Sequence, residues 1–89
     1  DLEDKLHEFI KINYPDIDNY EYNISPDNET IRIIFKHDFS DSDKILKNIE
    51  EIDTLLNTKF ISIESINGVT TFIHKFNTPL KTKWGMNNG

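Results

Sequence analysis

The side chains that could do chemistry in this sequence include three histidines, His7, His37 and His74. Their spacing is unlike that of metal-binding histidines, which occur in short, regular intervals or with nearby cysteines. Cysteine is absent, and the three glycines are too scattered to form a phosphate-binding loop. No serine or threonine stands with a histidine and a carboxylate in a recognisable catalytic arrangement. The sequence therefore predicts a non-enzymatic protein with no catalytic residues, no metal and no cofactor.

Carboxylates gather at two places in the sequence. Asp38, Asp41 and Asp43 surround the start of a predicted helix, where negative charge complements the positive end of the helix dipole. Asp16 and Asp18 are spaced like the first ligands of a calcium loop, but the required glycine and the bidentate glutamate at the end of such a loop are missing. The carboxylates are therefore interpreted as structural and solubilising groups.

Composition narrows the class of protein further. Eighty-nine residues are enough for one small domain, and the net charge is −6. An acidic chain disfavours a nucleic-acid backbone or an anionic membrane surface as partner. The longest apolar run is far shorter than a membrane span. The absence of cysteine excludes disulfides and is compatible with either an oxidising or a reducing compartment.

The pair Asn67-Gly68 gives the clearest structural signal. It separates two β-rich runs, and Asn-Gly readily adopts the positive φ angles of a two-residue hairpin turn. Such a turn fixes which side chains share a face. The register that it predicts pairs Ile66 with Val69, Ile63 with Phe72 and Ile61 with His74. His74 is thereby expected on the core side, as a histidine held by a hydrogen-bond partner.

A second hairpin is predicted around Pro26, which presets φ for a turn. The runs 20–24 and 31–35 alternate apolar and polar residues, except at Ile34. If Ser25 pairs with Thr30, the apolar residues of both runs fall on one face. The resulting pairs are Ile24 with Ile31, Tyr22 with Ile33, and Tyr20 with Phe35.

Helical periodicity appears in two segments. The first contains Leu2, Leu6, Phe9 and Ile10 and should end before Pro15, because the residue before proline disfavours the α region. The second is predicted to begin at a Ser40 cap and to stop at Asn57. Its apolar stripe consists of Ile45, Ile49, Ile52 and Leu56. Near-complete burial is expected for Ile33, Ile49, Ile52 and Ile63.

The predicted element order is α-β-β-α-β-β, and each helix has one apolar stripe. Two helices packed on one face of a four-stranded antiparallel sheet satisfy this pattern, which defines an α+β fold. The order is a circular permutation of the ferredoxin-like βαββαβ arrangement. Residues 1–76 are expected to form a single domain, followed by a polar C-terminal tail over residues 77–89.

The opposite face of the predicted sheet is mixed rather than fully polar. Its apolar residues include Ile34, Phe60 and Ile73, and Arg32 lies among them. A protein partner, a second copy of the chain or the tail residue Trp84 could cover this face. Scattered apolar residues are also normal on an ordinary solvated surface. These five residues are the predicted interaction residues.

One stretch resembles a known family. It consists of strand 31–35, a polar link with Phe39, a helix with spaced isoleucines, and the strand that runs through Ile61, Ile63 and Ile66. This order resembles the extracytoplasmic domains of type IV pilus alignment proteins of the PilO and PilN type, and of related type II secretion platform proteins. The resemblance covers roughly residues 2–76 and consists of apolar spacing and element lengths. Lys59 only loosely matches the basic residue found between helix and strand in that family.

The resemblance implies a scaffolding role. Such domains pair with themselves or with a paralogue, and they belong to membrane-anchored proteins whose domain is extracytoplasmic. Neither nucleic-acid binding nor direct membrane contact is expected of this segment. The alternative is a small acidic inhibitor or immunity protein from a phage or other mobile element, which would bind a basic enzyme surface and act in the cytoplasm.

Overall fold

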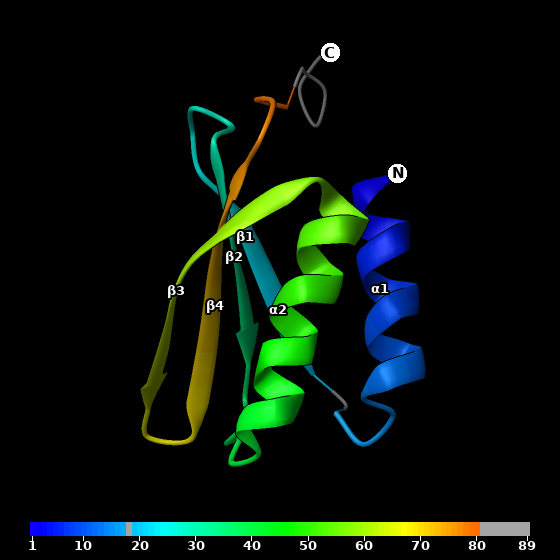
Figure 1. Ribbon diagram of the computed structural model, residues 1–89, viewed down its shortest axis with the longest axis vertical. Helices are drawn as coiled ribbons and strands as arrows, with labels where there is room; N and C mark the ends of the chain where they lie inside the picture. Colours follow the sequence, from blue (N-terminus) through cyan, green and yellow to red (C-terminus); the bar gives the residue numbers. More distant parts are fainter. Residues whose placement is uncertain (18, 81–89) are drawn as a thin grey trace.

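A computed structural model describes residues 1–17 and 19–80 of the chain. The elements follow the order α1 (Leu2–Asn13), β1 (Tyr20–Ile24), β2 (Thr30–Phe35), α2 (Ser42–Leu56), β3 (Thr58–Ile66) and β4 (Val69–Phe76). All strand pairs are antiparallel, and the strand order in the sheet is β1-β2-β4-β3. Both helices lie on the same side of the sheet (Figure 1). The predicted α+β fold is therefore confirmed, and the strand order is compatible with the permuted ferredoxin-like arrangement.

The helix ends follow from local chemistry. The Asp1 carboxylate caps α1 by accepting a hydrogen bond of 2.9 Å from the Asp4 backbone N–H. The prediction that Ser40 caps α2 is wrong, because Asp41 is the N-cap and accepts from the N–H groups of Asp43 and Lys44. Asn57 ends α2 in the left-handed conformation, as predicted.

The first hairpin has the predicted register, with all three expected apolar pairs on the core face. The second hairpin also has its two-residue turn, in which Asn67 and Gly68 have φ angles of 51° and 78°. From Ile66 to Ser62 its register is regular. A β-bulge then follows between Phe60 and Ser62, so that His74 pairs with Phe60 instead of the predicted Ile61.

Two of the four residues predicted to be almost fully buried are not. Ile33 and Ile52 are buried, but Ile49 is only half-buried and Ile63 is 38% exposed. α2 is rotated so that Asn48, rather than Ile49, lies deepest beside Ile52. Ile63 is exposed because β3 is the edge strand of the sheet. The buried apolar core consists of Leu6, Ile10, Ile31, Ile33, Phe35, Ile52, Leu56, Phe72 and Phe76.

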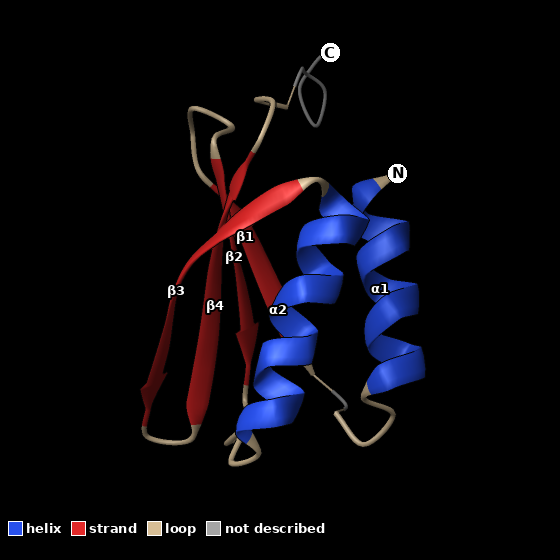
Figure 2. Cartoon of the chain, in the orientation of Figure 1, coloured by secondary structure: helices blue, strands red, loops and turns tan. Residues whose placement is uncertain are grey.

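Figure 2 shows the two-layer arrangement, with both helices on one side and the other face of the sheet without a helix. The predicted tail begins in contact with the domain. Leu80 packs against the core, and its backbone N–H donates to the Asn28 carbonyl over 3.2 Å. The Asn77 N–H similarly donates to the Asn57 carbonyl. Residues 81–89, including Trp84, lie outside the described residues, so the prediction that Trp84 contacts the sheet stays a prediction.

Candidate functional site

The face of the sheet away from the helices brings together three of the predicted interaction residues. Arg32 of β2 pairs with Ile73 of β4, and Ile34 pairs with Thr71 of β4 on the same face. The strand alternation that buries Ile31 and Ile33 turns Arg32 and Ile34 away from the core. Ile34 and Ile73 are half-buried by their neighbours, while Arg32 is exposed. We call this surface, from Glu21 on β1 to Glu64 on β3, the open face.

Phe60 does not belong to the open face, so its predicted position is wrong. It pairs with His74 on the core side, and the two rings lie 5.5 Å apart in an edge-on arrangement. The bulge accounts for the difference, because one extra residue in a strand exchanges the faces of the residues beyond it. Lys59 therefore lies on the open face, directly opposite Lys75.

A hollow of about 400 Å³ lies at this end of the sheet. Its lining combines the two lysines with apolar and amide groups: Lys59, Phe60, Ile61, Lys75, Phe76 and Asn77. Like charges directly opposite each other on neighbouring strands repel. Within the described residues, neither lysine forms an ion pair with a carboxylate. The charge of Asp27 in the β1–β2 loop acts on Lys75, so Lys59 is the cation at this end with the least compensation among the described residues.

A buried polar cluster joins α2 to β3 and β4 behind the open face. Asp53 accepts hydrogen bonds from the Thr58 hydroxyl (2.8 Å), from His74 Nδ1 (2.7 Å) and from the Phe60 backbone N–H (3.1 Å). His74 is fully buried, and its Nε2 atom has no partner among the described residues. A carboxylate–imidazole pair can orient a catalytic base. Here the imidazole is sealed within the core, out of reach of a substrate, so the cluster connects helix and hairpin.

The pKa of His74 predicts an effect of pH on stability. Burial lowers this pKa below its ordinary value of 6.5, although the hydrogen bond and charge of Asp53 oppose the shift. Below about pH 6.5 the unfolded chain binds the imidazole proton more readily than the folded protein. The free energy of unfolding should consequently fall on acidification, by at most about 1.4 kcal/mol per pH unit from this group.

Urea unfolding at mildly alkaline and mildly acidic pH would measure this effect. The exposed-histidine variant His37→Gln is the matched control for the removal of one imidazole. His74→Asn should lose the part of the dependence that His74 contributes. An unchanged dependence in His74→Asn would assign the effect to other groups.

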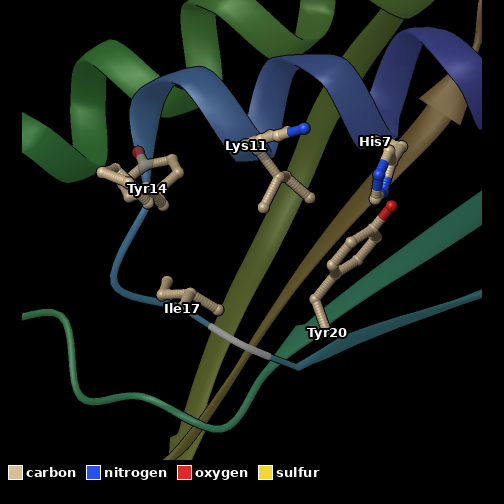
Figure 3. Close-up of a pocket in the computed structure, with 7 residues that line it drawn as sticks. His7, Lys11, Tyr14, Ile17 and Tyr20 are labelled. Atoms are coloured by element: carbon tan, nitrogen blue, oxygen red, sulfur yellow. The ribbon is translucent and has the colours of Figure 1, made fainter.

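Figure 3 shows a second hollow, between α1 and the segment that leads into β1. It has a volume of about 440 Å³ and is lined by His7, Ile10, Lys11, Tyr14, Pro15, Ile17 and Tyr20. Burial, together with the charge of Glu51, raises the pKa of Tyr14 to about 12. The Tyr14 hydroxyl therefore keeps its proton at neutral pH. The lining is largely apolar, and nothing in it selects one class of ligand.

Asp41 and Asp43 lie at the start of α2, in the structural position that the sequence predicts. In residues 1–17 and 19–80, no three histidine or acidic side chains come together in a group that could hold a metal ion. No helix in the same part of the chain is long and apolar enough to cross a membrane.

Comparison of the chain with protein-family models, with curated proteins and with solved structures yields no match. The described part of the chain is a two-layer α+β domain in which the helices cover one face of the sheet and no described element covers the other.

Proposed function

We propose that this domain is a non-catalytic protein-binding module of a larger assembly and that it binds its partner through the open face. The observation that carries the proposal is that both helices cover one face of the sheet, while among residues 1–17 and 19–80 no element covers the other face, where Ile34 and Ile73 lie. An apolar centre with a charged rim is the usual anatomy of a protein interface. Here the rim includes Arg32, with Glu21 and Glu64 towards the two edges.

The particular assembly proposed is a type IV pilus or type II secretion machine. The support is the sequence resemblance to alignment and platform proteins, whose domains have the same α-β-β-α-β-β order. In such a machine the domain would lie on the extracytoplasmic side of the membrane, pair with itself or a paralogue, and supply no catalysis.

A second candidate is an acidic inhibitor that binds a basic enzyme surface. The observation in its favour is the acidic outer side of the helix layer, where Glu8, Asp43 and Glu50 are exposed. This candidate uses the helices for binding and leaves the open face without a role. The two proposals therefore differ in which layer of the molecule contacts the partner.

Site-specific photo-crosslinking in cells that make the protein distinguishes them. A crosslinker at position 64 reports on the open face, and one at position 46 reports on the helix layer, because Glu64 and Leu46 are both exposed. We expect protein adducts at position 64 that disappear when Ile73→Asp is added. Asp16→Lys, a charge change at an exposed loop position that belongs to neither layer, should leave these adducts unchanged.

Adducts at position 46 alone would support the inhibitor and contradict the open-face proposal. No adducts at either position would contradict both. Circular dichroism of each purified variant ensures that a lost adduct reflects a lost contact rather than a lost fold.

A further inference from the structure

The two layers of the molecule differ in the balance of their charges. On the open face, the cations Arg32, Lys59 and Lys75 outnumber the carboxylates Glu21 and Glu64. The helix layer has an excess of carboxylates over lysines. Its carboxylates, counting the two capping residues, are Asp1, Glu3, Asp4, Glu8, Asp41, Asp43, Glu50, Glu51 and Asp53, and its lysines are Lys5, Lys11, Lys44 and Lys47. The strands of the open face therefore have one cation more than carboxylates, with Asp27 of the β1–β2 loop near Lys75, whereas the helix layer has a large excess of carboxylates.

The negative layer also has a hollow that could receive side chains. A groove of about 380 Å³ between α1 and α2 has Phe9 and Leu55 in its lining, with the carboxylates Glu50 and Glu51 on α2 beside them. Exposed apolar side chains occur on both helices, where Ile12 is 69% and Leu46 is 58% exposed. The helix layer thus combines acidic and apolar groups, as the open face combines basic and apolar groups.

We propose that the open face of one molecule binds the α1–α2 groove of a second copy. This inference rests on the proposed protein-binding function and specifies the partner. Arg32, Lys59 and Lys75 would face the carboxylates of Glu50 and Glu51, and Ile34 and Ile73 would contact the apolar lining of the groove. Complementary charge selects the partner and its orientation, while burial of the apolar groups supplies much of the binding energy.

The charge distribution favours this head-to-tail contact over a symmetric one. Two open faces packed against each other would offer only Glu21 and Glu64 to the cations of the other copy, fewer carboxylates than the helix layer supplies. The negative net charge of each copy opposes any self-association, but at an ionic strength of about 0.1 M charges farther apart than about 10 Å are largely screened. Charges at the contact therefore dominate the choice of orientation.

A head-to-tail contact leaves one open face and one groove unused at the ends of every pair. Such heterologous contacts continue into a ring if the rotation closes and into an open chain if it does not. The module would then organise an assembly by repetition of a single contact.

Sedimentation velocity over a wide concentration range tests the proposal with the purified protein and two variants. The sheet variant carries Arg32→Glu and Lys75→Glu, and the groove variant carries Glu50→Lys and Glu51→Lys. We expect wild type to associate beyond a dimer as concentration rises. Each variant alone should associate at least about tenfold more weakly, a loss of about 1.4 kcal/mol. A mixture of the two should regain association, because each variant's reversed surface matches the other's.

The control variant Asp16→Lys changes a loop charge away from both surfaces and should behave as wild type. The milder variants Arg32→Gln and Glu50→Gln repeat the test if a double variant fails to fold. A groove variant that associates like wild type would overturn the head-to-tail contact in favour of a symmetric one. A wild type that stays monomeric at high micromolar concentration would overturn self-association. Crosslinks to another protein at position 64 would, in that case, leave the proposed function intact with a different partner.

Discussion

Replacement of Phe35 with alanine is expected to lower the free energy of unfolding by about 3–5 kcal/mol. Phe35 is fully buried on β2, and its ring is the centre of an aromatic cluster. The ring centroids of Phe39, Phe72, Tyr14 and Tyr20 lie 5.3, 5.7, 6.0 and 6.4 Å from it. Removal of the ring leaves a cavity that helices and sheet can fill only in part, and the loss is a large share of the stability of a small domain.

Equilibrium urea unfolding, followed by circular dichroism, measures this loss. Phe60→Ala is the matched control, because Phe60 is a half-buried phenylalanine on the edge strand and should lose much less. A loss below about 1 kcal/mol for Phe35→Ala would mean that the aromatic cluster is not the centre of the core.

Asp53→Ala is expected to lower the free energy of unfolding by about 2–4 kcal/mol, somewhat less than Phe35→Ala. The change removes the acceptor of three donors at once, from Thr58, Phe60 and His74. A buried donor without an acceptor costs about 1–3 kcal/mol, and His74 is wholly shielded from water. Water can reach the partly exposed Asp53 position, which keeps the total below the sum of three full penalties.

Urea unfolding again provides the measurement, and Glu50→Ala provides the control on the exposed side of the same helix. Asp53→Asn should fall between the two, because its amide oxygen can still accept hydrogen bonds. Equal stabilities of Asp53→Ala and Glu50→Ala would exclude the proposed role of Asp53 as the link between α2 and the second hairpin.

The sequence was sufficient for the parts of the fold that local chemistry controls. The turn at Asn67-Gly68 sets the register of the second hairpin next to the turn. The alternation of apolar and polar residues sets the register of the first hairpin. Arg32, Ile34 and Ile73 consequently lie together on the open face, as predicted. The face on which each of them lies depends on the period of a strand and on the turn, whereas the pairing that places Arg32 beside Ile73 joins β2 to β4, which are distant in sequence.

The rest depends on contacts between elements distant in sequence. The bulge near Phe60 accompanies a hydrogen bond from its N–H to Asp53, seven residues earlier on a helix, and no periodicity within β3 signals it. Without the bulge, Lys59 would share the core side with Phe76. The rotation of α2 that buries Asn48 depends likewise on how the helix packs against the sheet. The apolar periodicity of the helix therefore predicts burial of Ile49, whereas the buried residue is Asn48.

The bulge in β3 has a further consequence, for the resistance of the protein to aggregation. An edge strand with free backbone groups can recruit identical strands into fibrils, and Ile61, Ile63 and Ile66 are all exposed on this one. The Phe60 N–H donates to the Asp53 carboxylate and is therefore not free to pair with another strand, and the bulge interrupts the regular backbone. Only Ser62 to Ile66 remains as regular edge, with Glu64 in its middle, and this is shorter than the roughly six-residue segments that form cross-β spines. The β-bulge that places Lys59 on the open face thus also limits fibril growth from this edge of the sheet.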